Sequence, residues 1–126
     1  IENVALMDDI RSMDAEKQEA VLKKVIGENP FIQLIAVTNP EGKRVTKNII
    51  QVVDSAKYEH FTKGDFSSSE WFIKVMEDGK THITNLYTSK ITGALITTIS
   101  TPICNSKGKI VGILEFDIKF EDAVKL

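Results

Sequence analysis

The sequence contains a single cysteine, Cys104, and it has neither a block of basic residues nor a long apolar run. One cysteine excludes an internal disulfide and any metal cluster that needs several thiolates. Sixteen Lys and Arg residues nearly balance eighteen Asp and Glu residues, giving a net charge of -2. Without a basic face the chain is not expected to bind nucleic acid. No stretch of about 18 apolar residues is present, so no segment of the sequence is expected to span a bilayer.

The motifs of common enzyme and cofactor sites are also missing. There is no glycine-rich phosphate loop and no Gly-x-Ser-x-Gly elbow. His60 and His82 have no second His or Cys at a ligand spacing, which favours surface or strand-edge positions over a metal site. We therefore predict no enzyme activity, no cofactor and no metal, although a Ser-His-Asp arrangement assembled in space stays open.

The composition is that of one globular domain spanning residues 1–126. It is 42% hydrophobic and 27% charged, and a chain of this length can bury a core without disulfides. The first residue is Ile rather than Met, it lies inside a helical pattern, and no signal peptide is recognisable. We expect a piece of a longer protein, in which membrane segments flank this domain.

Apolar periodicity predicts two helices within residues 1–27. Asp14 is placed to cap the second helix, and Gly27 is placed to end it. Residues 31–118 then change to the patterns of strands, interrupted by one crossover helix. Strands are expected at 31–38, 44–53, 81–88, 94–104 and 109–118. The prediction is an α+β fold with a five-stranded antiparallel sheet, followed by an exit segment at 119–126.

The crossover helix is expected at 67–78, within the stretch "DFSSSEWFIKVMEDG". Ser67 and Glu70 have the spacing of a capping box. Trp71 and Phe72 follow directly, and Trp71 is the only tryptophan of the chain. An indole offers an N–H donor and a broad apolar face, which suits either core packing or the wall of a ligand pocket.

Two further polar positions could face a pocket. Tyr87 supplies a hydroxyl from a predicted strand, and Asp117 lies late in the final strand among apolar residues. An acid in such a strand faces water or pairs with a cation, because burying it alone is costly. Glu115 shares one face of that strand with Asp117, which also fits a solvated edge.

Together these residues resemble the Cache family of extracytoplasmic sensor domains, in its single-module type, which has a PAS-like fold. The resemblance rests on "DFSSSEWF", which matches a family motif of the form D-x-S-x-R-x-W-F/Y, and on three later stretches, "YTSKITG", "TTISTPI" and "GILEFDI". It implies a ligand pocket on the concave face of the sheet, with Trp71, Phe72, Tyr87 and Asp117 as its residues. In the family the motif Arg grips a ligand carboxylate, and the late Asp receives an amine.

The motif Arg is replaced by Ser69 in this chain. A serine hydroxyl cannot supply the planar charged fork with which Arg holds a carboxylate. Either another cation, such as Lys47, Lys63 or Lys90, holds a different small acid, or the ligand is neutral or cationic and Asp117 supplies the charge. An amino acid bound in the family's usual way is not expected.

The resemblance implies a periplasmic or extracellular domain of a bacterial membrane receptor, namely a chemoreceptor, a histidine kinase or a cyclic-dinucleotide enzyme. It would bind a small organic ligand, form a homodimer through the N-terminal helix, and pass a conformational change to a C-terminal membrane helix. The alternatives are a cytoplasmic PAS-type module, a sensor-like domain that has lost its ligand and only dimerises, and a small enzyme.

Overall fold

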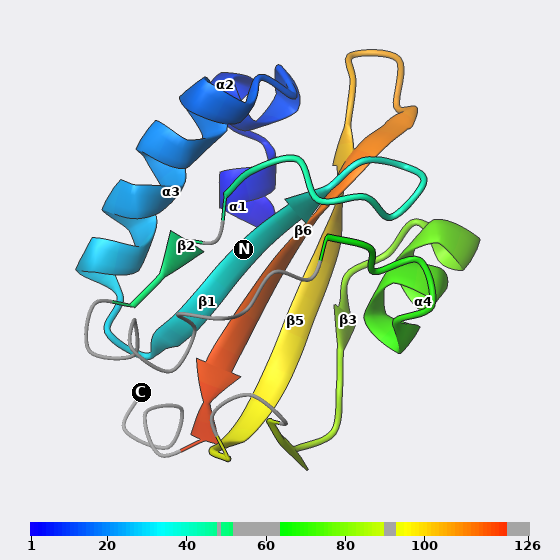
Figure 1. Cartoon of the computed structure of the whole chain (residues 1–126). Helices are drawn as coiled ribbons and strands as arrows, with labels where there is room; N and C mark the ends of the chain where they lie inside the picture. The colour runs from blue at the N-terminus through cyan, green and yellow to red at the C-terminus, as the bar shows by residue number, and fades with distance from the viewer. Residues whose placement is uncertain (48, 52–63, 90–92, 121–126) are drawn as a thin grey trace.

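The computed structural model describes residues 1–47, 49–51, 64–89 and 93–120, which form an α+β fold with an antiparallel sheet (Figure 1). Its elements, in chain order, are α1 (Glu2–Ala5), α2 (Asp8–Arg11), α3 (Ala15–Glu28), β1 (Ile32–Thr38), β2 (Ile49–Ile50), α4 (Glu70–Asp78), β3 (His82–Ile83), β4 (Tyr87–Thr88), β5 (Leu95–Cys104) and β6 (Ile110–Lys119). The predicted fold class is confirmed.

The N-terminal region is divided more finely than the sequence pattern suggested. The first expected helix is two short helices, α1 and α2, and α3 is the long one with 14 residues. Asp14 caps α3 as predicted, because its carboxylate accepts hydrogen bonds from the backbone N–H groups of Glu16 and Lys17 at 3.0 and 3.2 Å. The helix continues past Gly27 to Glu28, and Asn29 is its C-cap.

The strands lie in the order β2-β1-β6-β5-β3, with β4 also paired to β5. The sheet therefore has six strands rather than the five expected, because segment 81–88 forms two short strands. Between these two strands the Thr84 hydroxyl accepts a hydrogen bond from the Thr98 backbone N–H at 2.9 Å. In a regular ladder this N–H would donate to a backbone carbonyl instead. Segment 44–53 contributes only β2, and residues 52–53 lie outside the described part of the chain.

The crossover helix starts later than predicted. The N-cap of α4 is Ser69, whose side chain makes no capping hydrogen bond, and the expected capping box of Ser67 and Glu70 is not formed. Instead, the backbone N–H of Ser67 donates to Asp65 Oδ1 at 2.9 Å, and Glu70 pairs with Lys74 at 2.8 Å. The serine run is thus a turn organised by an aspartate, and the helix begins only after it.

Helices cover the two faces of the sheet differently (Figure 1). The helices α1 to α3 pack on one face, which we call the helix face, and build the main apolar core with Ala5, Ile10, Leu22, Ile26, Ile32, Ile35, Val37, Ile49, Ile103, Leu114, Phe116 and Ile118. The short helix α4 packs on the opposite face, which we call the α4 face, through Phe72, Val75 and Ile113. In the described residues no helix has the length and apolar character of a membrane span.

Candidate functional site on the α4 face of the sheet

The central strand β6 separates apolar from polar side chains by simple alternation. Leu114, Phe116 and Ile118 belong to the core of the helix face. Glu115 and Asp117 therefore point to the α4 face, because successive side chains of a strand alternate. Since β6 lies between β1 and β5, this position is the middle of the sheet. The interpretation of Glu115 as part of a solvated edge is wrong, because its side chain is only 3% exposed.

Asp117 is the end of a short hydrogen-bond chain that reaches β4. The Thr98 hydroxyl donates to Asp117 Oδ1 at 2.9 Å, and Tyr87 lies 2.6 Å from the same hydroxyl oxygen. Because a hydroxyl has one hydrogen, the Tyr87 hydroxyl must be the donor to Thr98. Burial, and then the nearby Asp117 carboxyl, raises the pKa of Tyr87 to about 12, so the phenol stays protonated at neutral pH. The structure thus brings two of the predicted site residues, Tyr87 and Asp117, into one network.

Glu115 and Asp117 form a hydrogen-bonded pair of carboxyl groups. Burial, and then the charge of Asp117, raises the pKa of Glu115 well above its ordinary value. Burial also raises the pKa of Asp117, while the hydrogen bonds from Glu115 and Thr98 oppose that rise. Both shifts favour the protonated carboxyl form, and hydrogen bonds oppose this only at Asp117. Among the described residues no cationic side chain forms an ion pair with either group.

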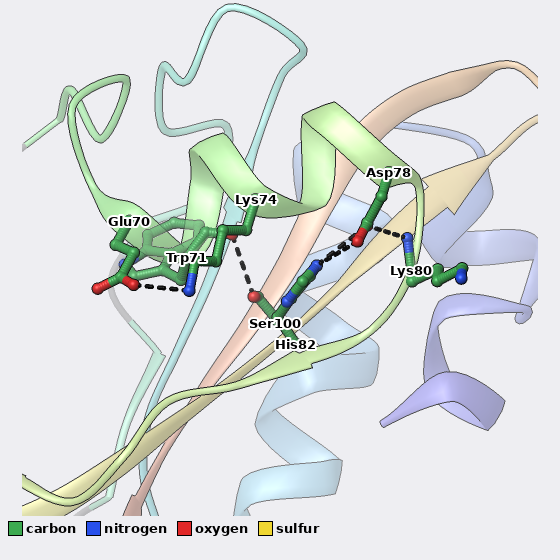
Figure 2. Close-up of polar contacts among 7 residues, drawn as sticks. All are labelled: Glu70, Trp71, Lys74, Asp78, Lys80, His82 and Ser100. Carbon is green, nitrogen blue, oxygen red and sulfur yellow. Dashed lines mark hydrogen bonds and ion pairs between the residues drawn. The ribbon is translucent and has the colours of Figure 1, made fainter.

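The N-terminal half of α4 lies over the next strand. Figure 2 shows the Ser100 hydroxyl donating to the backbone carbonyl of Trp71 at 3.2 Å. The indole of Trp71 contacts the ring of Phe66 at a centroid distance of 5.4 Å and that of Phe72 at 6.4 Å. Phe72 itself is only 7% exposed and packs on Ile113, so it belongs to the core under α4.

A groove of about 490 Å³ separates α4 from the β3–β4 segment, and Trp71 and Tyr87 line it from opposite sides. Its other lining residues are Glu70, Lys74, His82, Ile83, Thr84, Asn85 and Leu86. The predicted residues Ser69, Phe72 and Asp117 do not line this groove. Ser69 lies at the start of α4, where its backbone carbonyl accepts the N–H groups of the first helical turn.

Of the cations proposed as substitutes for the motif Arg, the structure describes only Lys47. Lys47 is exposed and precedes β2, whereas Lys63 and Lys90 lie outside the described residues. His82 is bound to the Asp78 carboxylate at 2.9 Å, beside the exposed ion pair of Glu70 and Lys74 (Figure 2). In the part of the chain that the structure describes, no cluster of three or more His, Cys, Asp or Glu residues could hold a metal ion.

One buried polar residue of β1 was missed. Gln33 is the extra residue of a β-bulge, because Ile32 is paired with Ile118 but Leu34 with the directly preceding Asp117. Its backbone carbonyl accepts the N–H of Gln51, whose own amide donates to the carbonyls of Ile26 and Ile32 beside α3. Gln33 is 0% exposed. Its only signal in the sequence is a single polar residue in the apolar run "FIQLIAV".

The amide of Gln33 is unusual in lacking any hydrogen bond. Within the described residues, four side chains have a buried polar atom without a partner, namely Gln18, Gln33, Thr38 and Thr46. Gln33 is the one among them in which both the amide oxygen and the amide nitrogen are unpaired. A buried polar atom without a partner costs about 1–3 kcal/mol of stability, so such a group in a native structure calls for an explanation.

Comparison with known proteins assigns this fold to a family. Residues 18–124 match the family described as "Methyl-accepting chemotaxis protein-like, first PDC sensor domain". The chain is also 46% identical over 123 residues to a protein of Syntrophus aciditrophicus (strain SB) named "Citrate (Re)-synthase", and 29% identical over 111 residues to sporulation kinase D of Bacillus subtilis (strain 168). These alignments cover 95% and 88% of this chain but only 20% of either relative.

The chain thus spans about a fifth of the length of the curated relatives it matches. The activity in a relative's name is that of a much longer protein. The predicted single domain at 1–126, and the single-module type, stay predictions, because the matching family is described as a first sensor domain.

Solved structures share the fold. One is the ligand-binding domain of the Pseudomonas aeruginosa PAO1 amino-acid chemoreceptor PctC in complex with GABA, with a TM-score of 0.64 and 19% identity, covering 95% of this chain and 50% of that one. Sensor domains of other chemoreceptors and of a histidine kinase are similar as well. The histidine-kinase domain among these neighbours is described as extracellular. With the family match over most of its length, the chain belongs to the PDC, or Cache-type, sensor domains of chemoreceptor-like proteins, homologous to the extracellular ligand-binding domains of chemoreceptors and histidine kinases.

Proposed function

We propose that this domain senses a small organic amine and that Asp117 receives the ammonium group. The observation that carries the proposal is the carboxyl pair on the α4 face, which has no cationic partner among the described residues. Ser69, in place of the motif Arg, offers no charged fork for a carboxylate. A cationic ligand would supply the missing positive charge, whereas a small acid would add to the negative charge.

A groove lined by Tyr87, which Thr98 links to Asp117, suits a small ligand. Trp71 and Tyr87 flank an opening of about 490 Å³, within the range of pockets that hold small molecules. Aromatic faces attract ammonium groups through cation–π contacts, and the Tyr87 hydroxyl leads through Thr98 to Asp117. Neighbouring sensor domains were solved with GABA, isoleucine or asparagine, all of which carry an amine.

In this proposal the signal leaves through β6. Asp117 lies between Phe116 and Ile118, whose side chains pack against the N-terminal helices on the helix face. A ligand that binds Asp117 better in one arrangement of this strand shifts the population toward that arrangement. The domain would then act as the periplasmic or extracellular sensor of a bacterial membrane receptor, linked to membrane helices at its two ends.

The same proposal includes a homodimer formed by the N-terminal helices. Leu6 is 68% exposed and Met7 is 42% exposed at the junction of α1 and α2, where they are available to a second copy. A chain extended at its N-terminus to the native helix length should sediment as a dimer, and Leu6→Glu should return it to a monomer. If the extended chain stays monomeric, dimerisation through this helix is wrong.

Thermal-shift screening of amines, amino acids and small carboxylic acids tests the ligand class. A ligand that binds only the folded state raises the melting temperature, and we expect this for amines. Asp117→Asn should abolish the shift, whereas Asp8→Asn, which removes an equally negative but exposed group on α2, should leave it unchanged. If acids bind and amines do not, the amine proposal is wrong. If no compound binds, the alternative of a domain that only dimerises is favoured.

A further inference from the structure

Two turns of the chain share a sequence pattern and a hydrogen-bond pattern. The stretches "NPEGK" at 39–43 and "NSKGK" at 105–109 both have the order Asn-x-x-Gly-Lys. In each turn the Asn side chain accepts the backbone N–H groups two and four residues later, at 2.9 to 3.0 Å. The glycines have positive φ angles, 84° at Gly42 and 79° at Gly108. Gly42 is buried, however, whereas Gly108 is exposed. The second turn therefore serves as an internal reference for what a neighbouring segment adds to the first.

The neighbour of the first turn is the segment that leads into α4. Two backbone hydrogen bonds of 2.8 Å join them, one from the Phe66 N–H to the Gly42 carbonyl and one from the Arg44 N–H to the Gly64 carbonyl. They form an antiparallel bridge just beyond the end of β1. The backbone before α4 is thus fixed to the turn that follows β1.

The turn and this segment approach so closely at Gly42 that no side chain fits between them. A Cβ atom at Gly42 would lie 2.7 Å from both Cα and N of Ser67, although favourable contacts between heavy atoms lie at about 3.5–4.0 Å. These are backbone atoms, so no change of rotamer can relieve the clash. At Gly108 an added Cβ would meet no atom within 4 Å. Alanine at 42 must therefore displace Ser67, whereas alanine at 108 is only strained by its positive φ.

An ion pair closes the same contact from the side. The Lys43 ammonium lies 2.6 Å from one carboxylate oxygen of Asp65, and the other oxygen accepts the Ser67 N–H at 2.9 Å. The hydrogen bonds from Lys43 and Ser67 lower the pKa of Asp65, so it stays ionised at neutral pH. Lys109, at the same place in the second turn, is exposed and has no ion pair within the described residues.

The contact is passed on to one wall of the groove. The Ser69 N–H, at the start of α4, donates to the Phe66 carbonyl at 2.9 Å. The ring of Phe66, only 7% exposed, lies 5.4 Å from the indole of Trp71. Trp71 lines the groove on one side, and the other side, residues 83–87, is attached to β5. The distance between the two walls therefore depends on where the first turn holds the segment before α4.

We propose that the turn at 39–43 positions the start of α4 and the Trp71 wall of the groove, with Gly42 and Lys43 as its positioning residues. A displacement of Ser67 moves Phe66 and Trp71 with it. The position of Trp71 follows from the contacts of the unliganded chain. Only the effect on affinity rests on the proposed amine ligand.

Fluorescence of Trp71 tests the positioning without any ligand. Trp71 is the only tryptophan of the chain, so the emission reports on this wall alone. In Gly42→Ala the emission should shift to longer wavelength, and acrylamide should quench it more strongly, because the indole moves away from Phe66. Gly108→Ala should leave both unchanged, although it places alanine at a similar positive φ. Melting curves show that both variants are folded. An unchanged emission in folded Gly42→Ala, or equal shifts in the two variants, would overturn the inference.

A second pair of variants keeps the test decisive if Gly42→Ala does not fold. Lys43→Gln removes the ion pair and keeps the glycine. It should shift the emission in the same direction but less, since exposed ion pairs hold their partners weakly. Lys43→Arg should restore the wild-type emission, and Lys109→Gln should not change it. If Lys43→Gln and Lys109→Gln have the same emission, Lys43 has no positioning role, and without a folded Gly42→Ala the inference is wrong.

Calorimetric titration with ethanolamine tests the consequence for binding. A cation–π contact with one aromatic ring is worth about two- to thirtyfold in affinity. Gly42→Ala should weaken binding by a factor in this range, and Gly108→Ala should bind like the wild type. Equal affinities in the two variants would show that the Trp71 wall does not hold the amine. If ethanolamine does not bind the wild type, the proposed function fails for this amine, while the fluorescence comparison still decides the inference.

Discussion

The two faces of the sheet differ in the side chains that they bury. The helix face carries the large apolar cluster, covered by three helices, with Gln18 as a buried polar residue on α3. The α4 face buries Thr98, Ser100 and Glu115 beside a smaller apolar cluster. Burying polar groups costs stability, so the helix face must supply most of the stability that the α4 face gives up. Such a fold can hold buried polar groups on one face and still stay folded without a ligand.

A truncation on the helix face should produce the largest change in stability. Ile35 is 0% exposed at the centre of that core, and Ile35→Ala should lower the free energy of unfolding by about 2–5 kcal/mol. Urea titration monitored by circular dichroism measures this value. Ligand affinity of the fraction that remains folded should not change. A large loss of affinity would show that the two faces are not separate in function.

A smaller effect with a clear pH signature is expected on the α4 face. The pKa of Glu115 is raised in the folded state. The stabilisation that comes from this shift is therefore fully present below the ordinary Glu pKa of about 4.3, and it is lost as pH rises through the raised pKa of the folded state. Each unit of the rise corresponds to about 1.4 kcal/mol. Glu115→Gln should flatten this decline. Melting temperatures across the pH range test it, and an unchanged pH dependence would place the titrating group elsewhere.

The smallest effect is expected at Tyr87. Tyr87→Phe removes the hydrogen bond to Thr98 and should cost about 0.5–1.5 kcal/mol of stability, while Thr98 still donates to Asp117. Alkaline titration of phenol absorbance should show a group with a pKa of about 12 that is missing from the variant. A tyrosine pKa near the ordinary value of about 10 would mean that Tyr87 is not joined to the carboxyl network.

The difference between the faces also explains what could be predicted from the sequence. The strands at 94–104 and 109–118 were predicted from the sequence, and so was the end of the crossover helix at residue 78, where Gly79 is the C-cap with its φ at 68°. These signals are local. The start of α4 was misplaced, because Asp65, bound by Lys43 from another turn at 2.6 Å, organises the serines before the helix.

The candidate site was harder to predict, because contacts between strands, which no local pattern shows, bring its residues together. Tyr87 and Asp117 were identified by type, but their link through Thr98 depends on the pairing of β4, β5 and β6. Glu115 was mistaken for a solvated residue because its burial comes from its place in the middle of the sheet. Gln33 could not be identified, since no local pattern distinguishes a bulge residue from one polar residue in a buried strand.

The bulge at Gln33 also affects how the register between β1 and β6 could change. Deleting this one residue would leave Ile32, Leu34 and Ile35 in regular alternation, with every apolar side chain still on its present face. The hydrogen-bond ladder between β1 and β6 would lose its irregularity, and only the amide would be gone. The register of β1 against β6 can therefore change by the insertion or loss of a single codon, without any substitution in the core.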